Sequence, residues 1–177
     1  MKNIRLPKLK NNISEIIRVN YAGEYGAKRI YEGQLAVLAN SEYGSEIKHM
    51  AAQEEEHLEY FKEEMLKRRV RPSLLSPLWH HGGFLLGKVT AKLGVNMAMI
   101  CTEAVEDVID KHYLKQIEII RERERILRDK IIKFREDELE HKEIASNFNK
   151  NKTLMNASVS KVIKFFCIIS IQLAKKI

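Results

Sequence analysis

Apolar residues recur at intervals of three and four along most of this chain, which is the spacing of one face of an α-helix. The clearest stripe, in residues 13–39, consists of Ile13, Ile17, Ala27, Tyr31, Leu35 and Leu38. Comparable stripes predict a second helix from about 45 to 69, a third that starts near Lys88 and includes 101–113, a fourth over about 127–148 and a last one over about 157–176. The pattern therefore predicts an all-α fold.

Breaks between these stripes indicate how the helices connect. Residues 40–45 form a short turn, whereas the apolar stretch 71–87 contains two prolines and three glycines. Two helical hairpins joined by one long connection make a four-helix bundle. We therefore predict a bundle of two hairpins with a long apolar crossover over about 70–90, an additional C-terminal helix, a flexible basic arm over 1–12 and a single domain over 13–177.

Two Glu-x-x-His sequences lie inside the apolar stripes of the second and fourth predicted helices. One consists of Glu54 and His57, and the other of Glu138 and His141. Residues three apart on a helix project from nearly the same side, so each pair presents a carboxylate and an imidazole together. Each pair can therefore supply half of a metal site.

The chain contains its own control for this pattern. Glu46 and His49 have the same spacing, but at 100° per residue they fall on the side of the helix opposite the apolar stripe, with Gln53 and Glu56. We expect these side chains to be solvated. The position in the helical register, rather than the spacing alone, selects the pairs that face the core.

A lone glutamate precedes each of the two core-facing pairs. Glu24 lies 30 residues before Glu54, and Glu106 lies 32 residues before Glu138. Two pairs plus one glutamate from each of two further helices form the six-ligand set of di-iron and di-manganese carboxylate bundles. Four carboxylates in an apolar core need counter-charges, and carboxylate with imidazole but no thiolate suits iron or manganese. Glu103 shares part of the face of Glu106 and remains an alternative to it.

Residues next to these candidates leave several interpretations open. Tyr113 either hydrogen-bonds a ligand or the substrate, or fills the core, and His112 either orients a ligand or packs. Gly23 and Gly26 flank Glu24, although glycine costs about 1 kcal/mol inside a helix. The two glycines indicate that another helix or a ligand approaches closely, the alternative being simple tolerance of small residues.

The chain is basic, with a formal net charge of +7 and a sequence pI near 9.3. Its basic residues are dispersed among acidic ones without interleaved aromatic residues, which argues against nucleic acid and favours an anionic membrane surface. In the crossover, Lys88 and Lys92 share one face, so we expect this stretch to lie in the membrane interface rather than to span it. His80 and His81 have no carboxylate at ligand spacing and are expected to be interfacial or solvated.

The last predicted helix is apolar nearly all round over residues 159–174. This stretch falls short of the roughly 20 residues that span a bilayer, so packing against the bundle and anchoring in the interface both remain open. The cysteines, Cys101 and Cys167, show no metal-type spacing and lie in apolar helical stretches. We expect both to be reduced packing residues.

Four stretches resemble the demethoxyubiquinone hydroxylases of ubiquinone biosynthesis: 18–27, 71–87, 104–113 and 134–141. The likeness covers about residues 13–174. It implies a ferritin-like four-helix bundle that acts as a di-iron monooxygenase at a membrane and hydroxylates the ring of a demethoxyubiquinone, in the penultimate step of ubiquinone synthesis. Carried over position by position, the ligands of the two irons would be Glu24, Glu54, His57, Glu106, Glu138 and His141, with Glu54 and Glu138 touching both.

The resemblance also implies reactants, partners and a location. Two iron ions per chain would react with dioxygen, with electrons from NADH or a reductase, although the sequence has no glycine-rich dinucleotide fingerprint. The eukaryotic transit segment of the family is absent, so we expect a peripheral enzyme on the cytoplasmic face of a bacterial inner membrane, as a homo-oligomer or with other ubiquinone-biosynthesis proteins. The alternatives are a ferritin-like iron store or peroxide scavenger with the same ligands, and a metal-free helical adaptor at a membrane.

Overall fold

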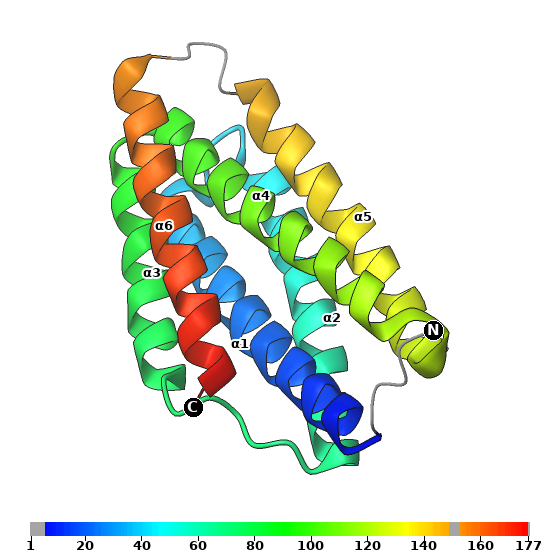
Figure 1. The fold of residues 1–177 in the computed structure, drawn as a ribbon. Helices are drawn as coiled ribbons and strands as arrows, with labels where there is room; N and C mark the ends of the chain where they lie inside the picture. Colours follow the sequence, from blue (N-terminus) through cyan, green and yellow to red (C-terminus); the bar gives the residue numbers. More distant parts are fainter. Residues whose placement is uncertain (1–5, 149–152, 177) are drawn as a thin grey trace.

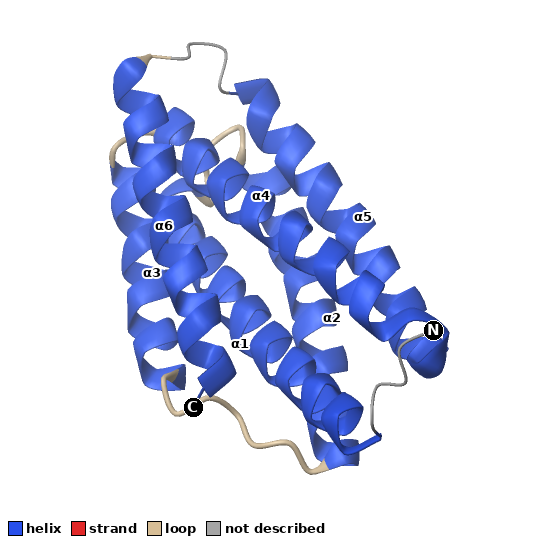
Figure 2. Ribbon diagram, viewed as in Figure 1, coloured by secondary structure: helices blue, strands red, loops and turns tan. Residues whose placement is uncertain are grey.

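The computed structural model describes residues 6–148 and 153–176, with side chains described from residue 12 onward, and this part of the chain is helical without a strand (Figures 1 and 2). The elements are α1 Leu6–Leu38, α2 Gly44–Arg68, α3 Ser76–Lys92, α4 Val95–Ile120, the short 3-10 helix η1 Arg121–Glu124, α5 Arg125–Phe148 and α6 Leu154–Lys176. The predicted all-α fold with an additional C-terminal helix is confirmed.

Four long helices surround one interior. α1 with α2 and α4 with α5 form the two predicted hairpins, and the hairpins meet through contacts of α1 with α4 and of α2 with α5. α3 packs along α1, whereas α6 packs on α4 and α1, so these two helices extend the bundle on one side (Figure 1). The predicted bundle of two hairpins is therefore present, with two more helices laid against it.

The apolar core consists of two main clusters that leave a polar layer between them. Phe61 and Phe134 belong to one cluster, and Met50 and Met99 belong to the other. Along each of the four bundle helices, the candidate ligands fall between a residue of the first cluster and a residue of the second. Burying a large apolar side chain contributes about 1.5–3 kcal/mol, so the two clusters stabilise the bundle on both sides of the ligands.

The predicted crossover is largely a helix, which is a correction to the expectation that helix resumes near Lys88. The sequence suggested a break because of its prolines and glycines, but Pro77 lies in the first turn of α3, where proline is tolerated. A Cβ atom at Gly87 would collide with the backbone carbonyl of Ile30 in α1. Gly87 thus allows close packing of α3 on α1. The helix is interrupted over residues 69–75, before α3, and again at Gly94, whose φ is +109°.

The ends of two helices also differ from the predictions. α1 begins at Leu6, within the predicted basic arm, whereas residues 1–5 lie outside the described part. α6 has 23 residues, about 34 Å at 1.5 Å per residue, so by length and composition it could cross a membrane, contrary to the shorter prediction. The polar residues that follow Phe148 in the sequence indicate a break between the fourth and last predicted helices, but residues 149–152 lie outside the described part.

Candidate metal centre

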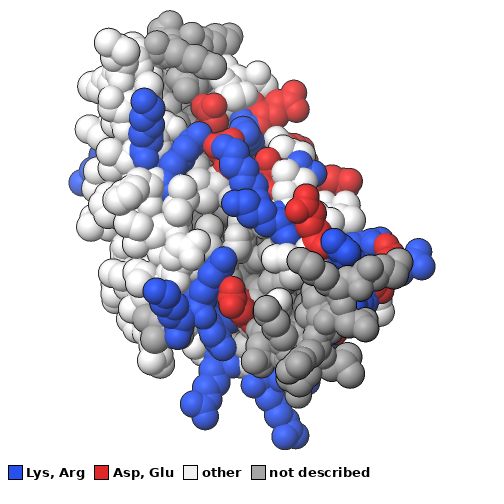
Figure 3. Space-filling view, viewed as in Figure 1, with Lys and Arg blue, Asp and Glu red and all other residues white. Residues whose placement is uncertain are grey.

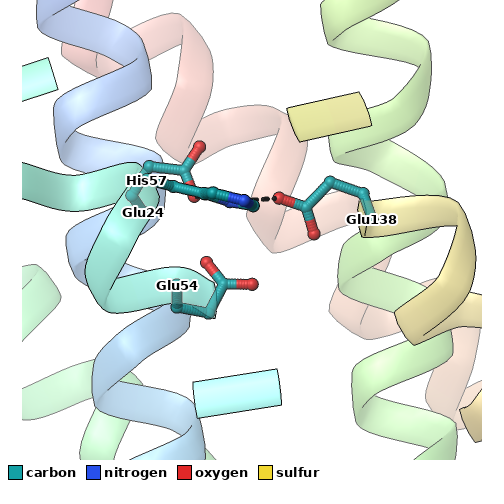
Figure 4. A group of neighbouring side chains, drawn as sticks. All are labelled: Glu24, Glu54, His57 and Glu138. Carbon is teal, nitrogen blue, oxygen red and sulfur yellow. Dashed lines mark ion pairs between the residues drawn. The ribbon is translucent and has the colours of Figure 1, made fainter. Parts of the chain in front are cut away.

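The six predicted ligands come together at the middle of the bundle. Each is at most 1% exposed, and they come from all four helices: Glu24 from α1, Glu54 and His57 from α2, Glu106 from α4, and Glu138 and His141 from α5. They form two overlapping groups of four, and within each group the donor atoms lie within 4.8 Å of one another. Glu54 and Glu138 belong to both groups. Figure 4 shows the group that contains Glu24 and His57, with carboxylates and imidazole directed toward a common space.

The donor atoms that face this space have no hydrogen-bond partner in the protein. These atoms are Oε2 of Glu24 and Glu106, both carboxylate oxygens of Glu54 and Glu138, and Nδ1 of His57 and His141. An unsatisfied buried polar atom costs about 1–3 kcal/mol, more when it is charged. Two divalent cations would satisfy all of these atoms and balance the four carboxylates, so the residues fit a two-metal centre.

Two tyrosines hold the terminal glutamates. The Tyr31 hydroxyl of α1 donates a hydrogen bond to Oε1 of Glu106 at 2.8 Å, and the Tyr113 hydroxyl of α4 donates one to Oε1 of Glu24. One oxygen of each glutamate is thereby occupied, which leaves Oε2 for the centre. Tyr113 thus contacts a candidate ligand, one of the roles left open by the sequence, whereas the role of Tyr31 was missed because it was counted among core residues.

The far nitrogen of each imidazole is also held. Nε2 of His57 lies 3.1 Å from Oδ2 of Asp137, and Nε2 of His141 lies 2.9 Å from Oε1 of Gln53. With Nε2–H donating to these oxygens, each Nδ1 presents its lone pair to the centre, as a metal-binding histidine does. Gln53 was predicted to be on the solvated side, but it is half-buried and reaches across to α5.

The centre repeats in the two hairpins, a pattern that the sequence already contains. Glu24 and Tyr31 are seven residues apart in α1, as Glu106 and Tyr113 are in α4. The repeat continues in the residues immediately before Glu54 and Glu138, which are Gln53 and Asp137. These matched spacings could have identified Tyr31, Gln53 and Asp137 as partners of the ligands from the sequence. In the structure each of the three contacts a ligand on the other hairpin.

The charges of the metal-free cluster are strongly coupled. Burial and the carboxylates of Glu138 and Glu24 raise the pKa of Glu54 well above its usual value. Burial acts against a charged His57, but the adjoining Glu138 and Glu24 carboxylates raise its pKa to about 12. Burial also acts against ionised Glu138, yet His141 and His57 hold the pKa of Glu138 at about 2. Protons therefore occupy the cluster when no cation does, and metal binding would release them.

The remaining candidates divide clearly. Glu106 belongs to one of the two groups and Glu103, which is half-buried, to neither. His49 is exposed, as expected, and lies 3.9 Å from Glu140, whereas Glu46 is half-buried. Neither residue belongs to the two ligand groups.

Asp107 and Lys111 are four residues apart, a spacing typical of a surface ion pair, but the structure buries Asp107. It is 7% exposed and receives hydrogen bonds from Lys111 and Lys142 at 2.6 Å and from Lys164 at 2.7 Å. Although burial opposes ionisation, the three lysines hold the pKa of Asp107 below its usual range. The carboxylate therefore joins α4, α5 and α6 beside Glu106, a contact that the pattern within α4 alone could not show.

His112 lies beside the centre without contacting its six side chains. Gln116 Nε2 lies 2.7 Å from His112 Nε2 and also donates to Asn20 at 2.6 Å. Burial and the charges of Lys175 and Lys115 lower the pKa of His112 to about 4, so the imidazole is neutral at neutral pH. The hydrogen-bond partner of His112 is thus Gln116, and the imidazole lines a cavity, so the two roles left open for His112 by the sequence both remain predictions.

A cavity of about 490 Å³ adjoins one end of the centre, and residues of α1, α3, α4 and α6 line it. Its lining is mostly apolar and includes Glu24, His112 and Tyr113. Gly23 and Gly26 also line it, and a Cβ atom at either would meet nothing within 4 Å. The space beside Gly23 and Gly26 agrees with the approach of a ligand, one of the interpretations left open by the sequence. The close contacts between helices occur at other glycines, such as Gly87.

The outer faces of α3 and α6 are apolar and exposed. They include Leu78, Leu85 and Val89 of α3 and Val162, Phe165, Phe166, Ile168, Ile169 and Leu173 of α6. Figure 3 shows a largely uncharged surface over α3 and α6, on the left, crossed by a few basic side chains. α6 therefore packs on the bundle, which is one of the two roles left open by its sequence, and it also keeps an exposed apolar face. Anchoring in the interface stays a prediction.

Smaller predictions in this region have mixed outcomes. Cys101 and Cys167 are free and pack in one apolar cluster, as predicted. His81 is exposed, as expected. His80 is only half-buried, and its Nδ1 lies 2.6 Å from the Tyr25 hydroxyl, so it joins α3 to α1.

A helical bundle with this arrangement of four glutamates and two histidines has the architecture of the ferritin-like carboxylate-bridged di-metal proteins. A model of the family described as ubiquinone biosynthesis protein COQ7 matches residues 11–174. The chain therefore belongs to the COQ7 family, which confirms the resemblance seen in its sequence.

Several curated relatives agree with this assignment. The NADPH-dependent 3-demethoxyubiquinone 3-hydroxylase, mitochondrial, of Dictyostelium discoideum is 45% identical over 168 residues, which cover 93% of this chain and 77% of that protein. The Homo sapiens protein of the same name is 41% identical over 169 residues, covering 93% and 78%. The 3-demethoxyubiquinol 3-hydroxylase of Rhodospirillum rubrum is 50% identical over 133 residues, covering 75% and 63%.

Proposed function

We propose that this chain is an oxygen-dependent monooxygenase that hydroxylates the ring of a demethoxyubiquinone in the penultimate step of ubiquinone biosynthesis. The observation that carries the proposal is the pair of overlapping ligand groups beside an apolar cavity. The donor atoms of these groups are buried and make no hydrogen bond within the protein. The names of the relatives, which are 3-hydroxylases of demethoxyubiquinone or demethoxyubiquinol, support the substrate.

In this proposal the six side chains hold two iron ions. Glu24 and His57 would hold one ion and Glu106 and His141 the other, and Glu54 and Glu138, which belong to both groups, would serve both. Bound iron supplies the activation of dioxygen. The protein supplies a dry interior around the centre, since all six side chains are buried between two apolar clusters.

The cavity then positions the quinone ring at the Glu24 end of the centre. Tyr113 fixes Glu24, so the wall of the cavity next to the reacting ring is rigid. The neutral His112 has one ring nitrogen held by Gln116, and we assign the other nitrogen to a quinone oxygen, which would orient the ring for attack. In this proposal Tyr113 and His112 are therefore the residues that act on the substrate side of the centre.

The exposed faces of α3 and α6 support peripheral binding to a membrane. A polyprenyl quinone stays in the bilayer, and the cavity is lined by residues of the same two helices. We assign the chain to the cytoplasmic face of a bacterial inner membrane. A homo-oligomer or a complex with other ubiquinone-biosynthesis proteins stays a prediction.

The electron donor is proposed to be a reduced nicotinamide dinucleotide. The sequence suggested NADH, whereas the names of several relatives specify NADPH, so the two must be compared directly. An iron store or peroxide scavenger is the less favoured function, because it has no use for a large apolar cavity next to the centre.

The test is turnover of a demethoxyubiquinone by iron-loaded protein with oxygen and either NADH or NADPH, followed by mass spectrometry of the quinone. We expect the product to gain one oxygen atom, taken from labelled dioxygen. Glu138→Ala removes a residue shared by both groups and should abolish turnover and lower iron content, whereas Glu140→Ala, exposed on the same helix, should leave both unchanged. Unchanged quinone with two irons bound would refute the hydroxylase.

A further inference from the structure

The hydrogen bonds that hold the ligands follow one plan in the two halves of the centre, apart from one pair of positions. Tyr31 and Tyr113 hold the terminal glutamates in the same way on both sides. Gln53 and Asp137 occupy matching places, one residue before Glu54 and one before Glu138. Gln53 is a neutral amide and Asp137 a carboxylate, so the acceptor of the imidazole hydrogen bond is uncharged in one half and charged in the other.

The difference in charge between Asp137 and Gln53 acts on the metal-facing Nδ1 atoms through the imidazole rings of His57 and His141. Asp137 accepts from Nε2 of His57 at 3.1 Å, and Gln53 accepts from Nε2 of His141 at 2.9 Å. A carboxylate that accepts this hydrogen bond makes the opposite nitrogen a stronger metal donor, and removing such a partner typically costs 10–100-fold in metal affinity. The side chain of Asp137 is only 18% exposed, so water screens its charge little.

We infer that Asp137 and Gln53 act as positioning residues that make the two metal positions unequal. The position of Glu24 and His57 binds its ion more tightly than the position of Glu106 and His141. This inference rests on the proposed two-metal centre and adds an order of loading to it. The tighter position is also the one next to the cavity, because Glu24 lines the cavity. The ion nearest the quinone would therefore be the last to be lost.

The experiment measures the two positions separately with cobalt(II), under anaerobic conditions, by calorimetry and visible absorption. His141→Ala leaves the Glu24 and His57 position, and His57→Ala leaves the Glu106 and His141 position. We expect the first variant to bind one cobalt ion at least about tenfold more tightly than the second. Adding Asp137→Asn, which keeps the size of the side chain and an acceptor oxygen, should weaken binding about 10–100-fold in the first variant only.

The reciprocal change and a control complete the test. Gln53→Glu should strengthen cobalt binding about tenfold when added to His57→Ala. Glu136→Ala, exposed next to Asp137, should change neither affinity. In the otherwise unaltered protein, Asp137→Asn should weaken one of two binding steps, which tests the inference even if a histidine variant fails to fold.

The outcomes separate this inference from the proposed function. Equal affinities at the two positions, or an equal effect of Asp137→Asn on both, would overturn the inequality while two bound ions still supported the centre. Failure of the unaltered protein to bind two ions would overturn the proposed centre and the inference together.

Discussion

Polar residues usually lie on the surface of a protein and apolar ones inside it. The four-helix core departs from this rule by burying charged residues, whereas α3 and α6 depart from it by exposing apolar ones. In the core, all four glutamates of the ligand groups, Glu138 among them, are buried. On α6, Phe165 is 60% exposed, and apolar neighbours on α3 and α6 are exposed with it. Buried charges and exposed apolar patches are the informative exceptions in a protein, because each is costly without a partner. The core indicates a cationic partner, and the outer helices indicate a lipid one.

Metal removal should have the largest effect on the core. A ligand present at a thousandfold over its Kd stabilises the folded state by about 4 kcal/mol, so loading should raise the Tm by about 8–16 °C. The two forms should also respond to pH with opposite sign. The raised pKa values of Glu54, Glu106 and His57 mean that the metal-free folded state holds extra protons, so its stability falls as pH rises above about 4.5 for the glutamates and 6.5 for His57.

Thermal unfolding between pH 6 and pH 8, with and without iron(II) or manganese(II), checks this sign. The Tm of the metal-free protein should decrease over this range, whereas that of the loaded protein should increase because deprotonation favours metal binding. Glu138, with its lowered pKa, contributes throughout this range and loses its contribution only below about pH 4.5. Parallel curves for the two forms would mean that the buried carboxylates do not receive the metal.

Gly87 of α3 and Gly23 of α1 should respond differently to alanine. Gly87→Ala forces a Cβ atom against Ile30 of α1 and should lower the free energy of unfolding by about 1–3 kcal/mol. Gly23→Ala projects into open space and should raise it by about 0.5–1 kcal/mol, since alanine favours a helix. Urea unfolding measures both, and the larger Gly23→Leu should reduce turnover without changing metal content. Equal losses for the two alanine variants would show that no open space exists at Gly23.

A charge on the outer face of α6 should weaken membrane binding without loss of fold. Phe165→Glu removes an exposed apolar side chain, and we expect about tenfold weaker binding to vesicles that contain anionic phospholipid, measured by co-sedimentation. Stability should change by no more than about 0.5 kcal/mol. Lys161→Glu, also exposed on α6, introduces a negative charge without removing apolar surface. Comparison of the two variants separates the effect of lost apolar area from the effect of charge. Unaltered vesicle binding by Phe165→Glu would place the membrane contact elsewhere.

The sequence was most informative where a single helix carries the signal. The register within α2 separated Glu54 and His57 from Glu46 and His49, because one face of one helix decides which side chains are buried. Contacts between helices were not predictable in this way. Gln53 was assigned to the solvated side of α2, yet a long side chain near the edge of a helix can reach a neighbouring helix, as it reaches His141.

The prolines and glycines of residues 71–87 led to the wrong prediction that helix resumes near Lys88, again because contacts between helices are decisive. Proline and glycine weaken an isolated helix, but packing of α3 on α1 overrides that preference, and Gly83 and Gly87 allow the approach. The three lysines at Asp107 come from α4, α5 and α6, so the periodicity of α4 revealed only the nearest of them.

Each of the two ligand groups draws on both hairpins. The first takes Glu138 from the second hairpin, and the second takes Glu54 from the first, while each tyrosine braces a glutamate across the same boundary. A newly made chain whose hairpins have not yet docked therefore offers no complete cage to an iron ion. In the proposed two-iron centre, capture of redox-active metal would therefore wait until the hairpins have docked, which would spare the unfinished polypeptide from oxidative damage.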